Sequence, residues 1–265
     1  MPVILTDPIA ANKTVVLWDS WFSRPVTVVS ASAQMTGFPA INITEEATYN
    51  SWRASGAPNY AGFDCGALRA VDALGIAAHT LGTSGAGVQL LGSNDDITYS
   101  TILSHSPLTN EELFFIFPLV SFRYYRVRVT LNGAQIGVVK AGRRLDFPCT
   151  PIMGYKPVHH SRKYNKYFNN SMEGHLLGNR VMSAGGTTTV EFPEIPRSFV
   201  DGPLRGFQDH YARGGTFFYA GWPGGKPQDV AYAWADGEDA MVDVSYTGGE
   251  KLSTVGFGMS MYYGR

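Results

Sequence analysis

The side chains that could carry catalysis are few in this sequence, and their spacing does not suit the chemistry. His159 and His160 are adjacent, whereas two histidines that bind zinc from one helix stand four positions apart. There is no G-x-S-x-G motif, and the glycine-rich turn at 82–87 lacks the Lys-Ser/Thr pair of a phosphate-binding loop. The sequence therefore predicts no catalytic residue and no enzymatic activity.

Carboxylates are the next candidates for chemistry. Glu45 and Glu46 are adjacent, so they point apart on any regular structure, make a poor acid/base pair and are expected in a solvated turn. Asp95 and Asp96 could bind Ca²⁺ together with backbone carbonyls, but the EF-hand pattern is absent. We therefore expect no metal and no cofactor, with Ca²⁺ at this turn as the alternative.

The composition favours a β-rich globular chain. Its 265 residues include 30 glycines and 15 prolines, which favour many short strands joined by turns. The formal net charge of −1 indicates no overall attraction to nucleic acid or to an anionic membrane. No apolar run reaches the length of a membrane span, and we expect no signal peptide. Cys65 and Cys149 are expected to be free thiols, with one bridge between them as the alternative.

The stretch 60–147 has the pattern of a single β-domain that would position any site. Apolar runs at 74–79, 88–93 and 113–117 are separated by turn-forming residues and predict strands. The last strand alternates, so that one face is formed by Tyr125, Val127 and Val129 and the other by Tyr124, Arg126 and Arg128.

Two turns and two arginines in this stretch have expected structural roles. The Asp64-x-Gly66 turn can redirect the chain sharply, because glycine tolerates positive φ. Arg123 and Arg126 flank tyrosines, so their guanidinium groups can stack on rings or pair with a carboxylate such as that of Asp64. We assign structural roles to these four residues and to Tyr125, with direct ligand contact by either arginine as the alternative.

Five short motifs follow one another between residues 40 and 147. They are YNSWR at 49–53, FDCG at 63–66, IAAHTLG at 76–82, SNDDITY at 93–99 and FRYYR at 122–126. Their order resembles the galactose-binding-like, discoidin β-sandwich family. The resemblance implies a jelly-roll sandwich. It departs from the secreted members in lacking their disulfide, because Cys65 lies within the Asp-x-Gly turn.

The resemblance also suggests a ligand site at the loop end of the sandwich. Trp52 and Tyr60 would stack on a sugar, and Thr83 and Ser84 of the glycine-rich turn would form hydrogen bonds to it. His79 stands within an apolar strand and is expected to be a core histidine, with ligand binding as the alternative.

A second part follows the sandwich. Pro148 and Pro151 frame a linker, so we expect residues 1–148 to form the sandwich with its entry strands and 149–265 to form a β-rich assembly domain. A short helix near 203–213 is predicted by an early proline and by apolar residues at helical spacing, namely Pro203, Leu204, Phe207 and Tyr211.

The segment 157–168 is the basic part of the chain, where basic side chains alternate with aromatic rings. Nucleic-acid binding would use such a mixture for phosphate contact and base stacking. Five basic-type residues in one loop of a neutral chain are weak support for that role. We therefore expect a solvated or subunit-contacting arm and no nucleic-acid partner.

The runs HTLGTSGAGVQL at 79–90 and GVVKAGRRLDF at 137–147 resemble discoidin-like modules in tail and baseplate proteins of tailed bacteriophages. This resemblance implies a non-enzymatic structural protein of the virion, at the distal tail, baseplate or tail tip, assembled in the host cytoplasm. It implies an oligomeric ring of copies of this chain, contacts with other tail proteins, and a host-surface glycan as a further ligand. A stand-alone carbohydrate-binding protein is the alternative.

Overall fold

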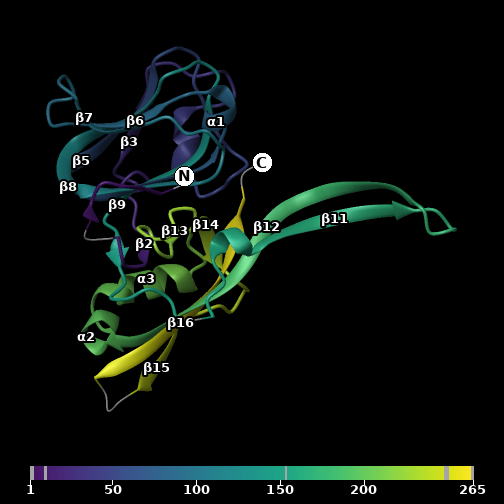
Figure 1. Ribbon diagram of the computed structural model, residues 1–265. Coiled ribbons are helices and arrows are strands. Elements are labelled where there is room, and N and C mark those ends of the chain that lie inside the picture. The colour runs from purple at the N-terminus through teal and green to yellow at the C-terminus, as the bar shows by residue number, and fades with distance from the viewer. Residues whose placement is uncertain (1–2, 9–10, 153, 248–250, 264–265) are drawn as a thin grey trace.

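A computed structural model describes residues 3–8, 11–152, 154–247 and 251–263. Within them the chain forms two eight-stranded sheets and a few short helices, so the predicted mainly β fold class is confirmed. Figure 1 shows a rounded β-sandwich above a second sheet, with one long hairpin projecting from the second sheet. No helix in the described part of the chain has the length and apolar character needed to cross a bilayer.

The first sheet folds over on itself to make the sandwich. Its strands are β1 (Val3–Leu5), β3 (Val28–Ala31), β4 (Trp52–Arg53), β5 (Asn59–His79), β6 (Val88–Ser93), β7 (Ser100–His105), β8 (Leu113–Val129) and β9 (Gln135–Gly142). Two long strands, β5 and β8, are shared by both layers. The first half of β5 pairs with β3 and with the end of β8, and its second half pairs with β9 and with the start of β8. The pairing register shifts after Asp64, where the chain passes from one layer to the other.

The second sheet contains the remaining strands. They are β2 (Val15–Leu17), β10 (Leu145–Asp146), β11 (Arg162–Asn170), β12 (Leu176–Pro196), β13 (Phe217–Ala220), β14 (Val230–Ala235), β15 (Asp243–Thr247) and β16 (Leu252–Tyr262). The strand order is β10-β2-β13-β14-β16-β12-β11, and β15 pairs with β16. The short helices are η2 (Ala40–Thr44), α1 (Leu81–Ser84), η3 (Val158–His160), α2 (Arg197–Val200) and α3 (Pro203–Ala212).

Helix α3 lies where the sequence predicts it. Pro203 occupies the first turn, where its missing N–H costs no hydrogen bond, and Gly214 with φ +75° follows the last turn. Leu204, Phe207 and Tyr211 are buried on the face that packs against the second sheet. This face fixes the helix against the sheet.

The two sheets share a hydrophobic core. Besides one cluster inside the sandwich and one under α3, a third cluster joins the outer face of the sandwich to the second sheet. Phe114 of β8 and Phe218 of β13 meet there, and Gly75 of β5 faces the Phe218 ring where no Cβ would fit. The sandwich and the second sheet are therefore held together by apolar packing.

The strands next to the sandwich belong to the second sheet. Leu145 pairs with Val16, and Asp146 pairs with Val15, so β10 and β2 are adjacent and antiparallel. The chain therefore leaves the second sheet after β2 and returns to it at the neighbouring strand, β10. The predicted boundary at residue 148 does not coincide with the change of sheet, because β2 and β10 precede it.

Candidate functional site

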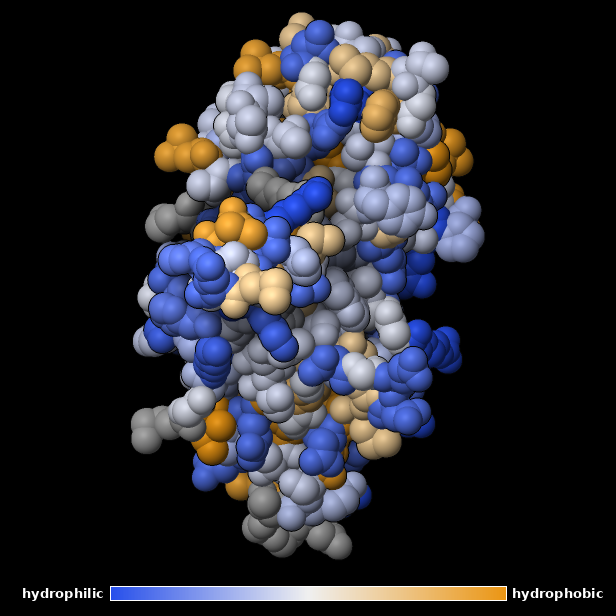
Figure 2. Space-filling view, turned by 90° about the vertical axis from the view of Figure 1, so that its right-hand side faces the viewer, coloured by the Kyte–Doolittle hydropathy of each residue, from blue (hydrophilic) through white to orange (hydrophobic). Residues whose placement is uncertain are grey.

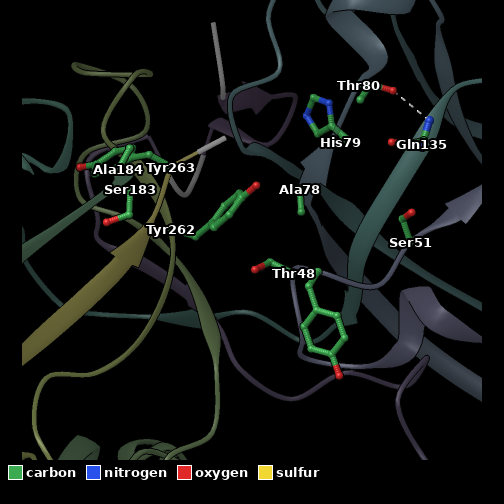
Figure 3. Close-up of a pocket in the computed structure, with 11 residues that line it drawn as sticks. Thr48, Ser51, Ala78, His79, Thr80, Gln135, Ser183, Ala184, Tyr262 and Tyr263 are labelled. Carbon is green, nitrogen blue, oxygen red and sulfur yellow. Dashed lines mark hydrogen bonds between the residues drawn. The ribbon is translucent and has the colours of Figure 1, made fainter. Parts of the chain in front are cut away.

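The candidate site is a cleft between the sandwich and the second sheet, close to the base of the long hairpin (Figure 3). Its volume is about 390 Å³, within the range of small-molecule sites. It is lined by Thr48, Tyr49, Ser51, Ala78, His79, Thr80, Gln135, Ser183, Ala184, Tyr262 and Tyr263. The lining combines tyrosine rings with hydroxyl and amide groups, which is the chemistry of a site for an uncharged polar ligand.

Segments that are distant in sequence form the walls. The end of β5 supplies Ala78 and His79, and the loop before β4 supplies Tyr49. The last strand, β16, supplies Tyr262, whose ring in Figure 3 reaches from the second sheet toward Ala78 and Thr48. Ala78 has φ +53°, an uncommon backbone conformation for a residue with a Cβ. Such outliers often occur at functional sites, and this one lies in the cleft wall.

Two hydrogen bonds fix the sandwich side of the cleft. The Thr80 N–H donates to the Gln135 carbonyl, and the Gln135 N–H donates to the Thr80 hydroxyl, both at 3.0 Å. The side-chain hydroxyls of Ser51 and Ser183 have no hydrogen bond to any other described residue, so both are available to a ligand. The cleft therefore combines a rigid wall with free hydrogen-bonding groups.

His79 is a neutral structural residue at the edge of this wall. Its Nε2–H donates to the Glu111 carbonyl at 2.8 Å, and its Nδ1 accepts from the Leu81 N–H at 3.3 Å, which defines the tautomer. Burial lowers the pKa of His79 to about 4, because the protonated ring would lose its hydration. No described lining residue therefore carries a charge at neutral pH.

The predicted ligand residues do not form one site. Trp52 is 0% exposed and belongs to the sandwich core, so its ring cannot stack on a sugar, and this part of the predicted site is wrong. Tyr60 is part of a stack with Arg126 on an outer face of the sandwich. His79 lines the cleft but is 3% exposed and uses both ring nitrogens internally. Thr83 and Ser84 lie in α1 and do not line the cleft, although the Thr83 N–H is held by Asn110 Oδ1.

The residues assigned structural roles have the following contacts. Arg123 donates to both carboxylate oxygens of Asp64 at 2.9 Å, and these hydrogen bonds lower the pKa of Asp64. Gly66 has φ +73° in the turn after it. Tyr125 is buried and donates its hydroxyl to the Arg69 carbonyl at 2.6 Å.

Arg126 lies between two rings on the outer face. Its guanidinium carbon is 4.1 Å from the centroid of Tyr60 and 3.8 Å from that of Tyr99, and Asp96 pairs with it at 3.1 Å. The face of the Tyr60 ring is therefore covered by the Arg126 guanidinium.

The turn considered for Ca²⁺ is held by its own hydrogen bonds. Asp95 Oδ1 accepts from the Thr98 N–H, the Ile97 N–H and the Ser93 hydroxyl, which together lower the pKa of Asp95 to about 2. Across the described residues, no three His, Cys, Asp or Glu side chains come together in a way that could hold a metal ion. Cys65 and Cys149 are both free.

The sequence interpretation missed most of the cleft. Tyr49 belongs to the YNSWR motif, so an exposed aromatic residue beside a buried tryptophan could have drawn attention to it. Tyr262 and Ser183 are over 100 residues from Tyr49, and only the fold brings them to the cleft. No spacing in the sequence could have indicated these contacts.

Comparison with solved structures finds carbohydrate-binding modules. A pectin-binding module matches 44% of this chain and 89% of its own, at 17% identity and a TM-score of 0.39. The CpGH89CBM32-6 module of Clostridium perfringens matches 47% of this chain and 99% of its own, at 15% identity and 0.42. The CBM32 module of AlyQ in complex with 4,5-unsaturated mannuronic acid matches 47% of this chain and 96% of its own, at 23% identity and 0.39. No protein-family model and no curated protein matches this chain.

Proposed function

We propose that this chain is a non-enzymatic protein that binds an uncharged carbohydrate in the cleft between the sandwich and the second sheet. The observation that carries the proposal is the composition of the cleft. Tyrosine rings stand there beside the unpaired hydroxyls of Ser51 and Ser183, and no described lining side chain is charged. A sugar presents apolar C–H faces and many hydroxyls, so it matches rings and polar groups together. A charged ligand would find no counter-charge among these lining residues.

Tyr49 gives the sharpest test of this binding site. It is 85% exposed, so Tyr49→Ala should leave the fold intact while removing one ring from the cleft. We expect about tenfold weaker binding of a neutral oligosaccharide selected on a glycan array, which corresponds to about 1.4 kcal/mol. The measurement is isothermal titration calorimetry.

Two further variants locate the site. Tyr246→Ala removes a comparably exposed ring, 62% exposed, from β15, which does not line the cleft, and should leave binding unchanged. Thr83→Ala tests the site predicted in the glycine-rich turn. Weaker binding after Thr83→Ala, together with full binding after Tyr49→Ala, would place the ligand at that turn and overturn the cleft proposal.

A second candidate function is a structural role in the virion of a tailed bacteriophage, at the distal tail, baseplate or tail tip, as an oligomeric ring. The long exposed hairpin of β11 and β12 favours it, because such an element suits contact between assembled subunits. In this role the protein would be found in the virion, bound to copies of itself and to other tail proteins. Light scattering on the purified chain tests it, since a stable monomer would argue against a ring.

A further inference from the structure

The hairpin formed by residues 162–186, here called the arm, is the most exposed element of the molecule. β11 pairs with the first part of β12 from Arg162 opposite Gly186 to Asn170 opposite Leu176. Every residue of β11 is exposed, and Figure 1 shows the arm extending away from the sandwich and from the rest of the second sheet. Nine residues of extended strand span about 30 Å, so the arm reaches well beyond the body.

The arm presents apolar side chains to solvent. The large exposed apolar residues on it are Tyr164, Tyr167, Phe168, Met172, Leu176, Leu177, Val181 and Met182. Figure 2 views the molecule from the side toward which the arm projects and shows scattered hydrophobic residues among hydrophilic ones. A two-stranded hairpin alone is marginally stable in water. Burial of these side chains against another surface would stabilise it.

The arm and the rest of the chain have opposite charge. Four cationic side chains and one carboxylate between Arg162 and Gly186 give the arm a formal net charge of +3. The whole chain has −1, so the remainder carries −4. The arm is therefore electrostatically complementary to the body of this same protein.

An acidic groove on the second sheet has the charge that complements the arm. Its volume is about 340 Å³, and it lies across β12, β16 and β15. Gly256 stands opposite Glu191 on one side and opposite Asp243 on the other, so the two carboxylates flank a position without a side chain. Both side chains are exposed, and neither forms an ion pair with a residue that the structure describes.

The arm cannot reach the groove of its own chain. β12 is one continuous strand from Leu176 to Pro196, and the arm is its first part while Glu191 lies in its last part. The strand therefore directs the arm away from Glu191. The groove is open to an arm only from another molecule.

We propose that the arm of one copy docks on the acidic groove of a second copy, with Lys163 and Arg180 of the arm facing Glu191 and Asp243 of the groove. Arg180 stands opposite Tyr167, and Lys163 alternates onto the same face as Tyr167, so both cations lie on one face of the arm. This inference rests on the second candidate function, assembly of the chain with itself. Arm and groove are different surfaces, so the contact is heterologous and its repetition gives a ring or an open chain of subunits.

Charge reversal on the full-length chain tests the docking. We expect the unmodified protein to be oligomeric by light scattering, and both the arm variant Lys163→Glu/Arg180→Glu and the groove variant Glu191→Lys/Asp243→Lys to fall to the monomer mass of 28.9 kDa. An equimolar mixture of the two variants should regain the oligomer, because each reversed surface then meets its complement. Glu238→Lys/Asp239→Lys makes the same charge change on exposed residues outside the groove and should leave the oligomer intact.

The possible results separate the claims. A monomeric unmodified protein would overturn both the docking and the assembly function, whereas sugar titration of the same sample would still report on the cleft. An oligomer that survives both charge reversals would overturn the docking alone. Loss of the oligomer without recovery in the mixture would also overturn it, because a general effect of charge would then explain the loss.

Discussion

Lys140 shows how a single buried charge ties the two sheets together. Its side chain is 2% exposed, and its ammonium donates to Glu46 at 2.7 Å and to the Thr216 carbonyl at 2.6 Å. Burial lowers the pKa of Lys140, and the Glu46 carboxylate opposes that shift. Glu46, expected in a solvated turn, therefore joins a loop of the sandwich to the second sheet. A lone lysine in an apolar strand gives no indication of its partner in the sequence.

At the same scale, His79 should make stability depend on pH. Its folded pKa of about 4 lies below the ordinary value of 6.5, so between these values the unfolded chain binds a proton that the folded chain does not. Stability should therefore fall as the pH drops from 7 to 5, by about 2 kcal/mol from this residue.

Urea unfolding of His79→Gln at both pH values measures this contribution. We expect the loss between pH 7 and pH 5 to be about 2 kcal/mol smaller than in the unmodified protein. His175→Gln is the control, because the side chain of His175 is 76% exposed. An unchanged pH dependence in His79→Gln would show that the buried ring is not the source.

Helix α3 packs on the second sheet through aromatic rings. The Phe207 ring is 5.2 Å from that of Phe217 and 5.4 Å from that of Phe257, both edge-on, and Tyr211 lies on the same face. Edge-to-face pairs add to the free energy of apolar burial. The helix is thus held by rings from two strands of the second sheet.

Removal of the Phe207 ring should therefore be costly. Phe207→Ala leaves a cavity under the helix and should lower the free energy of unfolding by about 3–5 kcal/mol. Arg205→Ala, on the exposed face of the same helix, should change it by less than about 0.5 kcal/mol. Urea midpoints compare the two variants, and equal losses would contradict the packing described.

Individual helices and strands were the part of this structure that the sequence predicted best. Pro203 and the spacing of Leu204, Phe207 and Tyr211 predicted α3, because its helix signals are local. The alternation in the last part of β8 placed Tyr125 inside and Arg126 outside for the same reason. Partners of strands are not local, so the sequence after Tyr155 predicted an arm and a strand, turn and strand, but not the register that pairs β11 with residues 176–186.

For the whole molecule, the sequence could not indicate how the two parts are joined. The linker between Pro148 and Pro151 suggested a division, but Val16 and Leu145 pair within the second sheet across 129 residues. These strands are only three and two residues long, and so short a side-chain pattern does not specify a partner. The cleft was unpredictable for the same reason, since its walls come from both parts.

A fragment of residues 149–265 should therefore fail to fold. It lacks β2 and β10, so it exposes the free edge of β13 and the face of Phe218 that packs on the sandwich. We expect no cooperative thermal unfolding by circular dichroism and a tendency to aggregate. A chain in which residues 11–17 are joined by a short turn to 145–263 keeps both strands and is the matched comparison. Cooperative unfolding of the shorter fragment would contradict this account.

The neighbouring positions of β2 and β10 have a consequence for how such a chain can change. Apart from β1, which precedes β2 in the chain and pairs with β8, the sandwich is inserted between β2 and β10, which are neighbouring strands of the second sheet. Another domain whose termini are equally close could be grafted there without rearranging the hydrogen bonds of that sheet, provided that its contacting face covers Phe218. The second sheet with its arm would then serve as a scaffold, and the sandwich would be a domain that another domain can replace.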